Sequence, residues 1–377
     1  MNIVLTGTTG IIGREVLAEL ILHHLNKQKI NKIICLARGS RNCSATNRIE
    51  NILTTIVEES GIEQQQLTGL VQIIDSSQDK PGSFESLLRF LMKENIKELS
   101  VLHLASTTNL SPLATTEEEI FRDSYLPTID LLTAVLPYVK QYSFVSTAFS
   151  CGHQQGLIPN EFIDMNITSN RNYYERYKLM AERKVKEICE RNSIRWQVLR
   201  SSIVSGRLIR EPYYYTPKFN VFYAWTGFFA SLKANNINCE GIRIQANPKS
   251  GVNIVSSDYV AKTIVRAFYT PSINELNLTH SHNYENTLLI PAMLNSVGVK
   301  NFEYVDKIPE KNITLAEKLY YKTAGSQFSP YLNTYEHQYD SVEIRQLMSD
   351  VAEPDIRTNF RNILQYAVER EFKNEFI

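Results

Sequence analysis

The sequence has no excess of charge of either sign, no paired cysteines and no long apolar run. Its 40 basic and 40 acidic residues give a formal net charge of zero, which argues against a surface that attracts nucleic acid or an anionic membrane. The five cysteines are scattered without a CxxC pair, which favours reduced thiols over a disulfide framework. The longest apolar stretch, residues 219–232, is too short to span a bilayer.

Two further absences narrow the class of protein. Met1 leads directly into an apolar segment and leaves no room for a signal peptide, so we expect a cytoplasmic protein. The histidines, adjacent at 23–24 and alternating at 280–282, have no cysteine or carboxylate partners at ligand spacing, so we predict no metal site.

The most informative segment is the N-terminal one, where a short apolar run meets three glycines spaced three residues apart. In a parallel sheet this pattern indicates a strand that passes into a helix around a phosphate group. Gly7 allows the tight turn, Gly10 lets backbone approach the phosphate, and Gly13 lets the helix pack against the strand. The helix N-terminus offers free N–H groups to the anion. The predicted cofactor-binding residues here are Thr6, Gly7, Thr8, Thr9, Gly10, Ile11, Ile12 and Gly13.

Apolar runs alternate with helix-period segments through the first 200 residues, and this alternation predicts a Rossmann-type α/β fold with a doubly wound parallel sheet. The predicted strands are 2–6, 32–37, 70–74, 99–103, 143–145 and 195–199, and the predicted helices include 12–25, 83–94, 125–135 and 173–190.

The alternation of apolar runs and helix-period segments stops after residue 200. We assign residues 1–206 to an NADP-binding domain, with strand elements returning at about 251–280. Residues 207–250 and 281–377 are interpreted as a smaller, mostly helical substrate-binding region. The aromatic segment 219–229 could line an apolar channel or form an ordinary buried helix.

The residue after the second predicted strand indicates which nicotinamide cofactor is bound. Folds that select NAD usually place a carboxylate there for the ribose 2′-hydroxyl, whereas this chain has Arg38. With Arg41 and Arg48, Arg38 could bind a 2′-phosphate, so NADP is favoured over NAD; the alternative is three solvated surface arginines. Asp75, after the third strand, could contact the adenine or cap the next turn.

Four residues form the predicted catalytic group. Ser146 and Thr147 end the fifth strand, and Tyr174 and Lys178 are one helical turn apart. A nearby cation, together with an oxidised nicotinamide, is expected to lower the tyrosine pKa so that Tyr174 acts as general acid or base, while a hydroxyl of Thr147 or Ser146 holds the substrate oxygen. A second Tyr-x-x-x-Lys match ends at Lys218; because Pro217 disfavours a helix, we interpret it as accidental.

These motifs together resemble the extended short-chain dehydrogenase/reductase superfamily, and more closely its thioester-reductase and fatty acyl-CoA reductase branch with a male-sterility-type NAD-binding domain. The resemblance covers most of the chain and rests on TGTTGIIG (6–13), CLAR (35–38), HLAS (103–106), STAF (146–149), YERYKLMAE (174–182), RSSIVSG (200–206) and VNIVSSDYVA (252–261).

The resemblance implies an NADPH-dependent reductase of an acyl thioester, carried by a carrier protein or coenzyme A, to an aldehyde and in some members onward to an alcohol. Thr147, Tyr174 and Lys178 would be catalytic, Lys178 would also bind the nicotinamide ribose, and Ala105 and Ser106 would lie at the cofactor. The chain departs from the family pattern at Ser106, Ser124, Ser201 and Ser256, where alanine, asparagine and two prolines are usual.

Two other functions share this fold. A nucleotide-sugar epimerase or dehydratase has the same Tyr/Lys pair but usually an acidic residue in place of Arg38. A non-catalytic NADP-binding sensor often loses the tyrosine or lysine, and both are present here. Acyl chain length, the thiol carrier and the oligomeric state are left open by the sequence.

Overall fold

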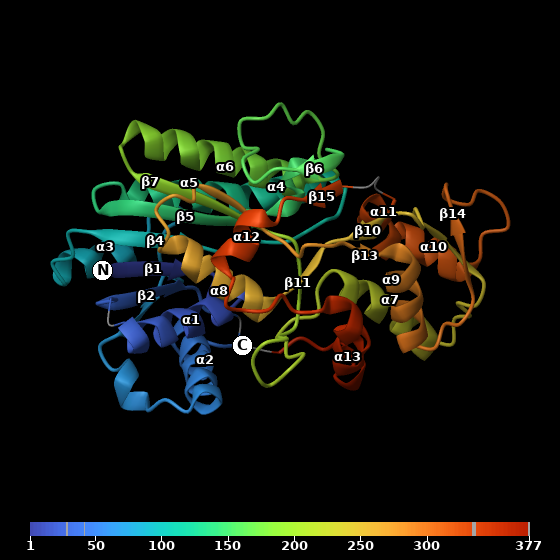
Figure 1. The fold of residues 1–377 in the computed structure, drawn as a ribbon, viewed down its shortest axis with the longest axis horizontal. Helices are drawn as coiled ribbons and strands as arrows, with labels where there is room; N and C mark the ends of the chain where they lie inside the picture. The colour runs from blue at the N-terminus through green and yellow to red at the C-terminus, as the bar shows by residue number, and fades with distance from the viewer. Residues whose placement is uncertain (28, 41, 334–336, 376–377) are drawn as a thin grey trace.

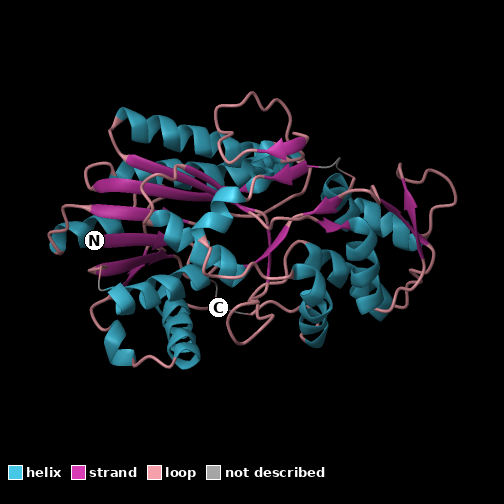
Figure 2. Cartoon of the chain, in the orientation of Figure 1, coloured by secondary structure: helices cyan, strands magenta, loops and turns pink. Residues whose placement is uncertain are grey.

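The computed structural model describes residues 1–27, 29–40, 42–333 and 337–375 (Figure 1). Its centre is a seven-stranded parallel sheet of order β12-β7-β5-β4-β1-β2-β3. Helices lie on both faces of this sheet (Figure 2), so the predicted doubly wound α/β fold is confirmed. The strands are β1 (Asn2–Thr6), β2 (Lys32–Ala37), β3 (Val71–Asp75), β4 (Leu99–His103), β5 (Val139–Thr147), β7 (Arg195–Ser201) and β12 (Glu275–Leu278).

The two faces of the sheet have separate apolar cores, as the alternation of side chains along a strand requires. In β1, Ile3 and Leu5 pack on one face and Val4 on the other, and all three are fully buried. The first face is covered by α1 (Ile11–Lys27), α2 (Ala45–Ser60) and α8 (Ser257–Phe268), and the second by α3 (Glu85–Lys93), α5 (Leu126–Val135) and α6 (Tyr173–Arg191).

A third apolar core, rich in aromatic residues, lies beyond the carboxyl ends of the strands, on the right in Figure 1. It is formed mainly by residues after 203. Its helices are α7 (Phe222–Ala234), α9 (Asn286–Ser296), α10 (Leu315–Lys322), α11 (Ala324–Leu332) and α13 (Ile356–Glu369), and its strands are β9 (Ile242–Gln245), β10 (Gly251–Val252), β13 (Tyr284–Glu285) and β14 (Phe302–Val305).

Further short elements lie outside the seven-stranded sheet. They are α4 (Ala114–Ile120), α12 (Val342–Leu347), the pair β8 (Ile203–Ser205) and β11 (Ile254–Ser256), and the pair β6 (Gly156–Ile158) and β15 (His337–Tyr339). No helix in the described ranges is long and apolar enough to cross a membrane.

The boundaries of several elements differ from the prediction. β5 starts at Val139, whereas the predicted strand began at 143. The prediction missed the first half of β5 because Lys140 and Gln141 interrupt the apolar pattern. Gln141 is nevertheless buried, and it donates to Gln197 Oε1 at 3.0 Å. The strand elements predicted to return at about 251–280 are β10, β11 and β12, and in the described part of 281–377, predicted to be mostly helical, the short strands β13, β14 and β15 lie among the helices.

The sheet reverses its order at β1, which lies between β2 and β4. In doubly wound folds the ligand crevice opens at such a point, outside the carboxyl ends of the strands. Thr6, the last residue of β1, joins the two sides of the crevice: its hydroxyl accepts N–H bonds from Leu104 and Ala105, both at 3.2 Å.

Candidate active site

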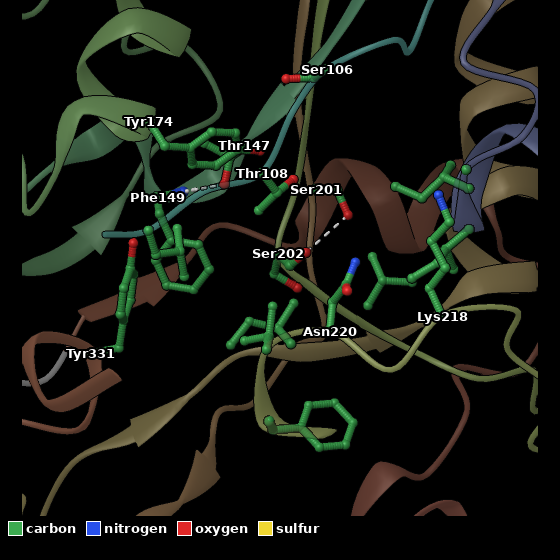
Figure 3. Close-up of a pocket in the computed structure, with 18 of the residues that line it drawn as sticks. Ser106, Thr108, Thr147, Phe149, Tyr174, Ser201, Ser202, Lys218, Asn220 and Tyr331 are labelled. Atoms are coloured by element: carbon green, nitrogen blue, oxygen red, sulfur yellow. Dashed lines mark hydrogen bonds between the residues drawn. The ribbon is translucent and has the colours of Figure 1, made fainter. Parts of the chain in front are cut away.

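A cavity of about 440 Å³ lies between the carboxyl edge of the sheet and the aromatic core (Figure 3). Its lining comes from segments that are far apart in the sequence. One end is formed by the glycine turn after β1, and the other by α7, α9 and α11. Hydroxyl groups and the α6 lysine lie between these two ends.

The glycine turn has no room for side chains. Gly7 has φ +74°, and a Cβ there would lie 2.7 Å from the Ala105 nitrogen. A Cβ on Gly13 would lie 2.0 Å from the Gly7 carbonyl oxygen. The Gly10 N–H donates to that same oxygen at 2.9 Å, and α1 begins at the next residue. The turn therefore presents the open N-terminus of a helix to the cavity, which suits a phosphate group.

The eight residues predicted to bind the cofactor at this turn divide into those that line the cavity and those that do not. Five of them line the cavity: Gly7, Gly10, Ile11, Ile12 and Gly13. Thr6, Thr8 and Thr9 are not in the cavity wall. Thr6 holds the loop after β4 through its bonds to the Leu104 and Ala105 N–H groups, and Thr8 is buried.

The residues predicted to select NADP lie just outside the cavity, beyond β2. Arg38 is exposed, and Arg48 in α2 donates to the Arg38 carbonyl oxygen at 2.7 Å. Asp75 accepts the Ser77 N–H at 2.9 Å, so its carboxylate caps the turn after β3, which was one of the two predicted roles. Arg41 lies outside the described residues.

Tyr174 and Lys178 both face the cavity from the first turns of α6. The helix begins there because the Asn172 side chain accepts the Glu175 N–H at 3.0 Å, an N-cap bond. The Lys178 ammonium donates to the Val145 carbonyl oxygen at 3.0 Å and lies 6.0 Å from the centre of the Tyr174 ring. The predicted shared face is therefore present.

Burial shifts both groups away from their charged forms. It raises the pKa of Tyr174 to about 12, against the lowering effect of a hydrogen bond from Thr108. It lowers the pKa of Lys178 to about 7, against the raising effect of Glu182. The sequence led us to expect a lowered tyrosine pKa, whereas in the protein without cofactor the loss of solvation raises it.

The two neighbouring hydroxyls at the end of β5 have different partners. Ser146 donates to Glu182 Oε1 at 2.5 Å, and Glu182 is also paired with Arg200, whose Nε lies 2.9 Å from Oε2. Thr147 accepts the Phe149 N–H at 3.3 Å, which leaves the threonine proton available to a ligand. The structure therefore favours Thr147 over Ser146 as the hydroxyl that holds a substrate oxygen.

Two of the departures from the family pattern are in contact. Ser106 lines the cavity and donates to the Ser124 hydroxyl at 3.2 Å, and Ser124 accepts the Thr107 N–H at 2.9 Å. Serine at both positions thus forms a hydrogen-bonded pair. Ala105 is held by its N–H bond to Thr6 and lies outside the cavity wall.

Several lining residues were not found by sequence reasoning. Ser202 has a buried hydroxyl without a hydrogen-bond partner among the described residues. Lys218 and Asn220 also line the cavity (Figure 3), and the only signal for Lys218 was the Tyr-x-x-x-Lys match interpreted as accidental. At the apolar end, the segment 219–229, for which the sequence offered a channel wall or a buried helix, lies mostly in α7 and supplies two lining residues from that helix, Phe222 and Trp225. The other residues that line this end are Leu289, Met293, Phe328 and Leu332.

The parallel sheet, its glycine turn and the helical Tyr/Lys pair define an NAD(P)-binding fold of the extended short-chain dehydrogenase/reductase type. The family model described as male sterility protein matches residues 5–264, more than half of the chain, and the chain belongs to this family of oxidoreductases. The family predicted from the sequence is confirmed. The comparison with curated protein sequences gives no match.

Solved structures with the same fold include enzymes of different kinds. The terminal R domain from the myxalamid PKS-NRPS biosynthetic pathway is 18% identical with a TM-score of 0.70, and the match covers 99% of this chain and 92% of that one. UDP-glucose 4-epimerase from Thermotoga maritima is 16% identical with a TM-score of 0.61, over 98% and 99%. The dTDP-glucose 4,6-dehydratase DesIV from Streptomyces venezuelae is 12% identical with a TM-score of 0.65, over 98% and 97%.

Proposed function

We propose that the protein is an NADPH-dependent reductase that converts an acyl thioester to an aldehyde. The observation that carries this proposal is the composition of one cavity. The glycine turn lies at one end, a large apolar wall at the other, and the Thr147 and Tyr174 hydroxyls lie between them. An apolar wall suits an acyl chain better than a sugar, whose hydroxyl groups need hydrogen-bonding partners.

The residues present fit a dinucleotide. Gly7 and Gly13 form a turn that a Cβ would obstruct, and α1 begins at that turn with free N–H groups. Lys178 would bind the nicotinamide ribose, and Arg38 with Arg48 would bind the 2′-phosphate of NADP. This last assignment follows from the cation after β2 where a carboxylate would select NAD.

NADPH, when bound, would supply the hydride that reduces the thioester carbonyl carbon. The Tyr174 phenol, which is protonated at neutral pH, would give a proton to the carbonyl oxygen. The Thr147 hydroxyl donates a second hydrogen bond to that oxygen. The tetrahedral hemithioacetal then loses its thiol as the carbon–sulfur bond breaks. The balance is thioester, NADPH and one proton to aldehyde, thiol and NADP⁺.

The likeness to the myxalamid R domain supports a carrier-bound substrate, since PKS-NRPS pathways carry their intermediates as thioesters. The thiol carrier would be a carrier protein or coenzyme A. Further reduction of the aldehyde to an alcohol needs a second NADPH and no additional residues. The likeness to 4-epimerases supports a nucleotide sugar as the second candidate substrate.

The decisive experiment measures NADPH and NADH oxidation with a panel of acyl-coenzyme A and acyl-pantetheine thioesters, with UDP-glucose and dTDP-glucose conversion measured in parallel. We expect thioester-dependent NADPH oxidation with release of aldehyde or alcohol, and a loss of at least about 100-fold in Tyr174→Phe. Conversion of a sugar nucleotide without thioester turnover would replace the proposal by the second candidate. NADPH binding without any turnover would indicate a non-catalytic protein.

A further inference from the structure

Lys218 lies in the second half of the chain, yet it lines the same cavity as the N-terminal glycine turn. In Figure 3 its side chain extends toward the blue ribbon of α1, the helix that begins at Ile11. It is half-buried, and within the described part of the chain its ammonium group forms no ion pair. Half-burial of a cation without a counter-charge is unfavourable unless a ligand supplies the negative charge.

The electrostatic surroundings of Lys218 are positive. Burial lowers the pKa of Lys218, and the second cause of this shift is the charge of Arg48. Arg48 follows the N-cap of α2 by four residues and bonds the Arg38 carbonyl oxygen. Three cations from different parts of the chain therefore surround the region between the glycine turn and the end of β2, where the open N-terminus of α1 adds its positive dipole end.

The backbone on both sides of Lys218 is held by the C-terminal segment. The Glu375 N–H donates to the Pro217 carbonyl oxygen at 2.9 Å, and the Phe219 N–H donates to Asn374 Oδ1 at 2.8 Å. The Glu375 carboxylate also pairs with Arg14 of α1 at 3.3 Å. These bonds tie the backbone around Lys218 to the C-terminal segment, and that segment to α1. The position of Lys218 relative to α1 is therefore fixed by the fold.

We propose that Lys218 binds the pyrophosphate of the dinucleotide, opposite the glycine turn. The pyrophosphate is preferred over the 2′-phosphate because Lys218 shares the cavity wall with Gly10, Ile11 and Gly13, whereas Arg38 and Arg48 lie outside it. The cofactor is then held from both halves of the chain. This inference rests on the proposed cofactor but requires no thioester chemistry.

The test is the dissociation constant of NADPH and of NADH, measured by fluorescence titration without any substrate. We expect Lys218→Met to weaken both cofactors by about tenfold, because both contain the pyrophosphate and a charge-assisted bond is lost. Lys218→Arg should restore affinity to within about threefold. Arg38→Ala should weaken NADPH alone, and the exposed Lys249→Met is the matched control with unchanged affinities.

Two outcomes overturn the proposal. Unchanged affinity of Lys218→Met for both cofactors would mean that the lysine does not contact the dinucleotide. A loss confined to NADPH would place it at the 2′-phosphate instead. The midpoint of thermal unfolding of each variant separates lost binding from lost folding. Since no thioester is present, absence of reductase activity leaves this result unaffected.

Discussion

At one end of the cavity the wall is a turn built on three glycines and the start of a helix, and at the other it is a set of large apolar side chains. The first end comes from one continuous segment, residues 7–13, in which a Cβ at Gly7 or Gly13 would collide with backbone. The second end comes from α7, α9 and α11, which lie between residues 222 and 332. At Gly7 and Gly13 any side chain would collide with the backbone, so these positions cannot change. A wall of side chains, in contrast, changes its shape when its residues are substituted.

This contrast suggests that the two ends respond differently to substitution. A pyrophosphate has one shape, so the turn that binds it is a fixed arrangement of backbone N–H groups. Under the proposed function an acyl chain is recognised by the volume that surrounds it, so we expect Trp225 and Met293, which line the apolar end, to limit the length of the chain. The hydroxyls of Thr147 and Tyr174 lie where the two ends meet.

The largest expected effect is at this meeting point and compares two adjacent hydroxyls. Thr147→Val should lower kcat by about 100-fold or more, because a donor to the developing oxyanion is lost. Ser146→Ala should keep kcat within about threefold but lower the free energy of unfolding by about 1–3 kcal/mol, because Glu182 loses a buried donor. Steady-state kinetics and urea unfolding measure the two quantities.

The outcome that contradicts this assignment is an equal loss of kcat in both variants. The two hydroxyls would then act together at the substrate, as the sequence alone allowed. NADPH affinity serves as the control, since neither substitution touches the glycine turn.

The two ends also differ in how far they could be predicted from the sequence. The glycine turn and the Tyr/Lys pair follow from local spacing, because each depends on residues within one turn or one helix, and the parallel sheet follows from the alternation of apolar runs with helix-period segments. The apolar end follows only in part: the sequence offered the segment 219–229, which contains Phe222, as a possible channel wall, whereas Met293 and Phe328 join it only through long-range packing. Sequence reasoning missed Lys218 for the same reason, because its position depends on hydrogen bonds that join the backbone on either side of it to residues 374 and 375.

A substitution at the apolar end should change substrate length alone. Met293 is 1% exposed, and Met293→Trp should reduce the apolar volume of the cavity, so that kcat/KM falls about tenfold for long acyl thioesters and little for short ones. NADPH affinity should be unchanged. The exposed Met180→Trp on α6 is the matched control. If NADPH affinity falls as well, the two ends are not independent.

The smallest expected effect concerns Lys178, which lies between the two ends and has its pKa lowered to about 7. Between pH 7 and its ordinary pKa, the unfolded chain holds this proton while the folded chain releases it. Stability from this group therefore rises with pH in that window, and the full cost of burying the charge is present below pH 7. Between pH 7 and 8.5 the free energy of unfolding should increase by about 1–2 kcal/mol relative to Lys178→Met.

Urea unfolding of the cofactor-free protein and of Lys178→Met at several pH values from 6 to 8.5 measures this difference. Tyr174 does not contribute in this range, because its pKa is raised to about 12 and its ordinary value is already near 10. Parallel curves for the two proteins would show that Lys178 stays charged when buried. The lysine would then meet the cofactor as a cation at neutral pH, and the ends of the cavity would be separated by a permanent charge.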